Sequence, residues 1–66
     1  MNPRQAKAIA ARVTADLDLH PPLGSAVVMR VVAPDSLASS LPPLRRYPEE
    51  LHAPIESRIL QAADDG

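Results

Sequence analysis

The sequence predicts an α+β fold, a small single domain over residues 1–66 built as helix, strand, loop and bent helix (α-β-α). Three observations predict it: an amphipathic, alanine-rich first segment, a valine-rich second segment, and a last segment whose apolar residues recur every four positions. The chain contains one convincing strand, and a lone strand cannot satisfy its backbone hydrogen-bonding groups. We therefore expect this strand to be completed by pairing with a second chain.

The first element is a helix over residues 3–18. Asn2 is a good N-cap, Pro3 suits the first helical position, and Gln5 stands three residues after the cap, as in a capping box. Apolar residues then follow at a spacing of four, which places them on one face. The residues of this face that we expect to contact a partner are Ile9, Val13 and Leu17.

The second element is a strand over residues 25–33, bounded by Gly24 and Pro34. Four β-branched valines within nine residues favour extended structure. They occupy both parities of the strand, so both of its faces are expected to be covered. The valines expected to contribute to the interaction are Val27, Val28, Val31 and Val32.

Residues 34–47 are predicted to form a loop rich in proline and serine, and the alternative is a second strand over 37–44. Within the loop, Asp35-Ser36-Leu37 resembles the Asp-Ser-Leu site of acyl carrier proteins, whose serine receives a phosphopantetheine arm. The resemblance covers three residues, and the Pro42-Pro43 pair replaces the long helix that follows the serine in those carriers. We interpret Asp35 as the start of a turn and expect no cofactor.

The end of this loop has the composition of a docking motif. Arginines can bind carboxylates or phosphates, tyrosine is favoured at interfaces, and preceding prolines pre-set an extended backbone. The alternative is a rigid linker whose charges are solvated. The residues concerned are Arg45, Arg46 and Tyr47.

The last element is a helix over residues 48–63 that is bent or broken near residue 53 by Pro54. Glu49 and Glu50 suit the first turn, where carboxylates interact favourably with the helix dipole. The spacing of four among the apolar residues continues across the proline, which predicts one shared apolar face. Its interaction residues are Ile55 and Ile59.

Composition excludes several functional classes. The chain has no cysteine and two histidines separated by 32 positions, so we expect no metal site and no cysteine nucleophile. Two helices and a strand cannot enclose a substrate pocket, so we expect neither an enzyme nor a small-molecule substrate. No apolar run approaches the length of a membrane span, and the N-terminus lacks the apolar centre of a signal peptide. We expect a soluble, cytoplasmic chain without a membrane partner.

These observations favour a non-catalytic protein-interaction or accessory subunit. It would bind a larger protein or its own copy through the valine strand and the apolar helix faces. The alternative is a homodimeric, antitoxin-like or DNA-binding transcriptional regulator, whose strands pair with each other. The net charge of −1 and the pI of about 6.0 make nucleic acid the less favoured partner.

Overall fold

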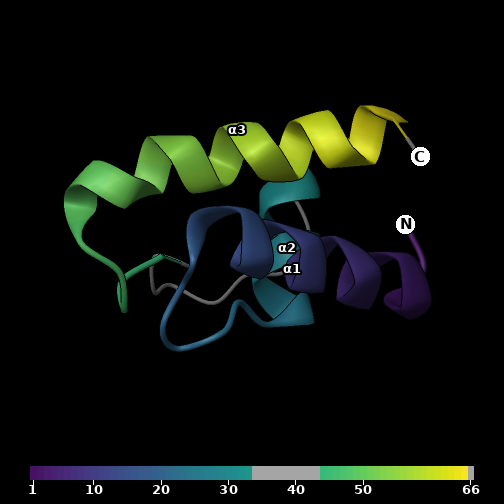
Figure 1. The fold of residues 1–66 in the computed structure, drawn as a ribbon. Coiled ribbons are helices and arrows are strands. Elements are labelled where there is room, and N and C mark those ends of the chain that lie inside the picture. The colour runs from purple at the N-terminus through teal and green to yellow at the C-terminus, as the bar shows by residue number, and fades with distance from the viewer. Residues whose placement is uncertain (34–43, 66) are drawn as a thin grey trace.

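The computed structural model describes residues 1–33 and 44–65, and within those ranges it contains three helices and no strand. The helices are α1 (Pro3–Leu17), α2 (Ser25–Val32) and α3 (Glu49–Asp65). Each packs against the other two. Helices α1 and α3 run in opposite directions, α2 crosses behind them, and the two termini lie at the same end of the molecule (Figure 1). The predicted α+β class is therefore wrong: the described part of the chain is all-helical.

The correction concerns residues 25–33, which we predicted to be a strand and which form α2. The valines of this segment follow the spacing i, i+1, i+4, i+5, which fits a helix better than a strand of period two. Val28 is fully buried, while Val27, Val31 and Val32 flank it and are partly buried. A helix satisfies most of its backbone groups internally, so the expected pairing with a strand of a second chain loses its basis.

Helix α1 begins with the capping box that the sequence indicates. The Asn2 side chain accepts a hydrogen bond from the Gln5 backbone N–H at 2.9 Å, and the Asn2 backbone N–H donates to the Gln5 side chain at 3.2 Å. The helix ends at Leu17, and its C-cap is Asp18, whose backbone is left-handed (φ 51°). Aspartate tolerates this conformation better than most residues do, and the chain turns there toward α2.

Helix α3 is continuous from Glu49 to Asp65, with Pro54 inside it. Pro54 is exposed, so its ring lies on the solvent side of the helix. Before α3, residues 44–47 form a turn in which the Tyr47 N–H donates to the Leu44 carbonyl at 3.0 Å. The remainder of the predicted loop, with the Asp35-Ser36-Leu37 string and most of the 37–44 segment, lies outside the described residues.

The core is formed by inward faces of all three helices together with side chains from the connecting turns. Alanine at two core positions of α1 leaves little side-chain volume between that helix and its neighbours. Leucines and a tyrosine from the turns close the ends of the core. Its buried residues are Ala6, Ala10, Val13, Leu19, Leu23, Val28, Leu44, Tyr47, Ile55 and Ile59.

Candidate functional site

The apolar residues that we expected to contact a partner pack against one another within the chain. Val13, Val28, Ile55 and Ile59 are at most 1% exposed, so no surface is left on them for a second protein. The half-buried residues of the predicted set pack against the same core. They are Ile9, Leu17, Val27, Val31 and Val32.

Of the predicted docking motif, Tyr47 is buried, whereas Arg45 and Arg46 are exposed. The Tyr47 hydroxyl donates a hydrogen bond to the Pro21 carbonyl at 2.7 Å, and this bond joins the turn before α3 to the turn after α1. Burial raises the pKa of Tyr47 above its ordinary value, and the nearby Arg46 charge partly opposes this. His52 Nε2 donates to the Tyr47 carbonyl at 2.9 Å. Tyr47 thus joins two turns and α3.

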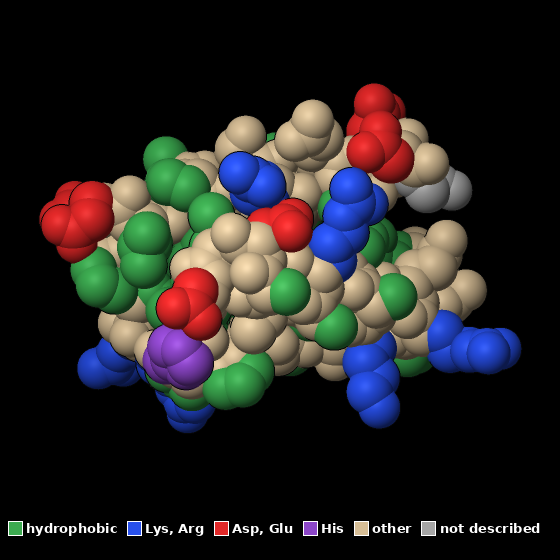
Figure 2. Space-filling model, in the orientation of Figure 1, with side chains coloured by type: hydrophobic (Ala, Val, Ile, Leu, Met, Phe, Trp, Pro, Cys, Tyr) green, Lys and Arg blue, Asp and Glu red, His purple; other side chains and the backbone are tan. Residues whose placement is uncertain are grey.

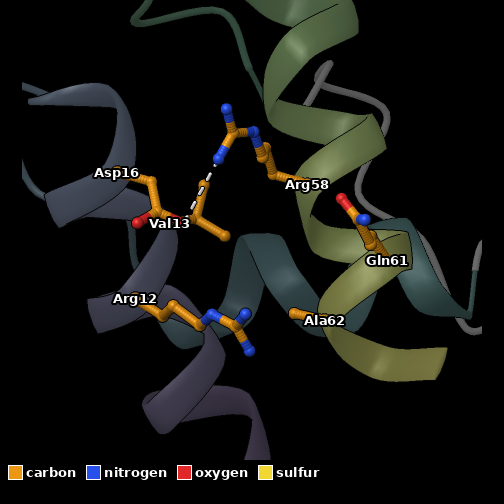
Figure 3. Close-up of a pocket in the computed structure, with 6 residues that line it drawn as sticks. All are labelled: Arg12, Val13, Asp16, Arg58, Gln61 and Ala62. Carbon is orange, nitrogen blue, oxygen red and sulfur yellow. Dashed lines mark hydrogen bonds and ion pairs between the residues drawn. The ribbon is translucent and has the colours of Figure 1, made fainter. Parts of the chain in front are cut away.

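A surface pocket of about 210 Å³ lies between α1 and α3. Two arginines reach into it from opposite helices: Arg12 extends from α1 toward Ala62, and Arg58 extends from α3 toward Asp16 (Figure 3). The Arg58 Nη1 and Asp16 Oδ2 atoms are 3.4 Å apart. Val13 and Ala62, both buried, contribute apolar lining, and the amide of Gln61 completes the wall.

The outer face of α3 carries an exposed row of acidic and apolar side chains, which we call the α3 stripe. Its spacing of four, three, four and four residues keeps the row within about 80° of the helix circumference and extends it over about 22 Å. Leu60 is 51% exposed, the largest exposed fraction among the large apolar residues of the described chain. The α3 stripe consists of Glu49, Ala53, Glu56, Leu60 and Asp64, all of them exposed.

Charge is unevenly distributed, although the whole chain carries only −1. Helix α3 contains five acidic residues and one basic residue, whereas α1 contains three basic residues and one acidic residue. In Figure 2, acidic side chains gather at the two ends of α3, and Lys and Arg side chains project along the lower edge of the molecule. Acidic side chains therefore predominate on α3, and basic side chains predominate on α1.

Neither metal ligation nor a membrane span is indicated in the described ranges. Residues 1–33 and 44–65 contain no group of three or more His, Cys, Asp or Glu side chains placed to hold a metal ion. No helix in these ranges has both the length and the apolar composition to cross a membrane. Comparison of the chain with protein-family models, curated proteins and solved structures gave no match.

Neither the α3 stripe nor the pocket between α1 and α3 was predicted from the sequence. The α3 stripe could have been found by placing residues 49–64 on a helical wheel, since its spacing is visible in the sequence. The pocket could not, because the Asp16–Arg58 pair joins positions 42 residues apart and depends on how α1 and α3 pack.

Proposed function

We propose that this chain is a non-catalytic interaction module that binds another protein through the α3 stripe. The partner presents a basic segment with an apolar side chain for Leu60. The single observation that carries this proposal is the position of Leu60, half-exposed and flanked one helical turn away on either side by Glu56 and Asp64. An apolar residue bordered by polar or charged side chains is a common arrangement at protein interfaces.

Electrostatics favour a basic partner over an acidic one. The last turn of α3 holds Asp64 and Asp65 and no basic residue, although the C-terminal end of a helix already carries a partial negative charge. No residue of the α3 stripe is basic, so its carboxylates, Glu49, Glu56 and Asp64, have no cation within the stripe. A partner's lysines or arginines would offset this unfavourable concentration of negative charge.

The route to the interaction differs from the one that the sequence suggested. We expected a valine strand to add to a partner's sheet, or to pair with its own copy in a DNA-binding dimer, but that segment is α2. The exposed row on α3 instead favours a helical contact, in which apolar anchors recur at helical spacing. Association guided by charge of this kind weakens as ionic strength rises.

The test is a titration of the full chain with two synthetic helical peptides, followed by two-dimensional ¹H–¹⁵N NMR. One peptide carries lysines around a leucine stripe, and the other replaces every lysine by glutamate. We expect saturable shifts confined to the α3 stripe with the lysine peptide and none with the glutamate peptide. Shifts of equal size with both peptides, or shifts centred on α1, would refute the proposal.

Two variants separate the contribution of this row from general acidity. Glu56→Lys places a cation beside Leu60 and is expected to abolish binding of the lysine peptide. Glu50→Lys makes the same change on the same helix, outside the α3 stripe and about 120° from Glu56 around the helix axis. It is expected to reduce binding only slightly. Equal losses in the two variants would mean that net charge, and not the α3 stripe, governs the interaction.

A further inference from the structure

The pocket between α1 and α3 has more positive charge than its own carboxylate can balance. Arg12 and Asp16 stand on successive turns of α1, and Arg58 and Gln61 stand on successive turns of α3. The lining therefore contains two guanidinium groups and one carboxylate, which gives a formal charge of +1 among the lining residues.

The pairing between Arg58 and Asp16 leaves most donors of both arginines available. Arg58 and Asp16 make a single contact at 3.4 Å, which is longer than the ~2.7–2.9 Å of a strong charge-assisted hydrogen bond. The Arg58 side chain is 48% exposed and the Asp16 side chain is 39% exposed, so water competes for the atoms that form this contact. Arg12 forms no hydrogen bond or ion pair with any residue in the described ranges, and its guanidinium extends into the pocket (Figure 3).

We propose that this pocket binds a carboxylate group, held between Arg12 and Arg58 with the Gln61 amide as a third donor. A guanidinium binds a carboxylate through two parallel N–H donors, and the two arginines approach from opposite walls. A single negative charge matches the excess of +1, whereas a phosphate dianion would exceed it and be repelled more strongly by Asp16.

The size of the pocket restricts what enters it. Its volume of about 210 Å³ lies below the ~300 Å³ at which pockets for whole small ligands begin. It therefore takes a terminal group, either that of a free carboxylic acid or that of a glutamate side chain in a peptide. This site is separate from the α3 stripe, because Arg58 points about 160° away from Leu60 around α3.

The experiment is an NMR titration of the full ¹⁵N-labelled chain at constant ionic strength. The probes are sodium acetate, an acetylated and amidated Ala-Glu-Ala peptide, sodium phosphate, and sodium chloride as the reference. We expect saturable shifts at the Arg12 and Arg58 side-chain N–H groups and at the Gln61 amide with acetate and with the peptide. Tighter binding of the peptide identifies a protein carboxylate as the source, and equal binding identifies the bare group. Tighter binding of phosphate than of either carboxylate, or no saturable shift beyond that of chloride, overturns the proposal.

Three variants test the charge argument in both directions. Arg12→Gln is expected to weaken acetate binding about fivefold, the upper range for one exposed ionic contact. Arg4→Gln, the same change at an exposed position outside the pocket, is expected to leave binding unchanged. Asp16→Asn removes the competing carboxylate and is expected to strengthen binding. Weaker binding in Asp16→Asn, or equal losses in the two arginine variants, would contradict the assignment.

Discussion

Two neighbouring residues of α3 provide the sharpest test of how this helix is oriented. Ile59 is fully buried, and Leu60 is 51% exposed. Replacing Ile59 by alanine removes three carbons from the core, a transfer loss of about 2.4 kcal/mol, and the cavity left behind brings the total within about 2–5 kcal/mol. A chain of 66 residues has a total stability of about 3–10 kcal/mol, so Ile59→Ala removes a large part of it.

Leu60→Ala is the matched control, since it removes a similar number of carbons one position along the same helix. Because Leu60 keeps half of its surface in water, the loss is expected to stay below about 1 kcal/mol. Thermal and urea unfolding followed by far-ultraviolet circular dichroism measure both variants. For a domain of this size each kcal/mol lowers the Tm by about 4–8 °C, so Ile59→Ala is expected to melt at least about 10 °C below the wild type.

The comparison also tests the proposed interaction surface. Similar losses in the two variants, or a larger loss in Leu60→Ala, would mean that α3 packs through a different face, and both the fold and the α3 stripe would then be refuted. If the expected order holds, Leu60→Ala becomes a folded variant without its apolar anchor. Its affinity for the lysine peptide is expected to fall while its Tm falls by less than about 8 °C and the chain stays folded, which separates binding from folding.

Three further substitutions test contacts outside the helix faces. Tyr47→Phe removes the hydrogen bond to the Pro21 carbonyl and is expected to cost about 0.5–1.5 kcal/mol at neutral pH. Since burial raises the folded-state pKa of Tyr47 above 10.0, the wild type should lose stability as the pH rises past about 10, and Tyr47→Phe should lack this loss. Thr14→Val removes a hydroxyl that accepts from the Leu23 N–H at 2.9 Å and is expected to cost about 1–3 kcal/mol, whereas Thr14→Ser should retain most of the stability. Pro54→Ala restores a backbone donor inside α3 and is expected to raise stability by about 1–3 kcal/mol.

Urea unfolding at several pH values checks all of these substitutions. Identical alkaline behaviour of the wild type and Tyr47→Phe would show that another group governs stability above pH 10. Equal losses in Thr14→Val and Thr14→Ser would assign the effect to packing and not to the hydroxyl. Lower stability in Pro54→Ala would mean that the proline restricts the unfolded chain more than it disturbs the helix.

The sequence predicted the two long helices because their signals are local. The Asn2 and Gln5 capping box and the spacing of four in both end segments depend on neighbours in the chain. For residues 25–32, β-branched composition was given more weight than spacing, and the prediction of a strand was wrong. The β-propensity of valine reflects how well it fits a covered surface, and the interior between α1 and α3 supplies such a surface to a helix. The presence of apolar residues at both parities was the signal for α2.

The surface features differ in how far sequence could reveal them. The α3 stripe depends on the register of one helix, so its members follow once residues 49–65 are known to be helical. The pocket forms only because α1 and α3, which are distant in sequence, pack against each other at a particular position along their axes and in a particular rotation about them. Ala6 and Ala10 of α1 are buried, and nothing in the local sequence pattern states which helix they will pack against.

The core and the binding surfaces of this chain draw on different residues, and this division decides how a partner can bind. Every predicted apolar contact residue is wholly or partly used within the chain, and the connecting turns add their own leucines to the same interior. What remains outside on α1 and α3 is mostly charged and polar side chains, together with alanines, prolines and a single exposed leucine. Recognition by such a surface depends mainly on charge, and charge interactions between exposed groups are screened over about 10 Å at 0.1 M salt. Binding at the α3 stripe should therefore weaken steeply with salt, while the folding of the chain, which rests on buried apolar contacts, should not.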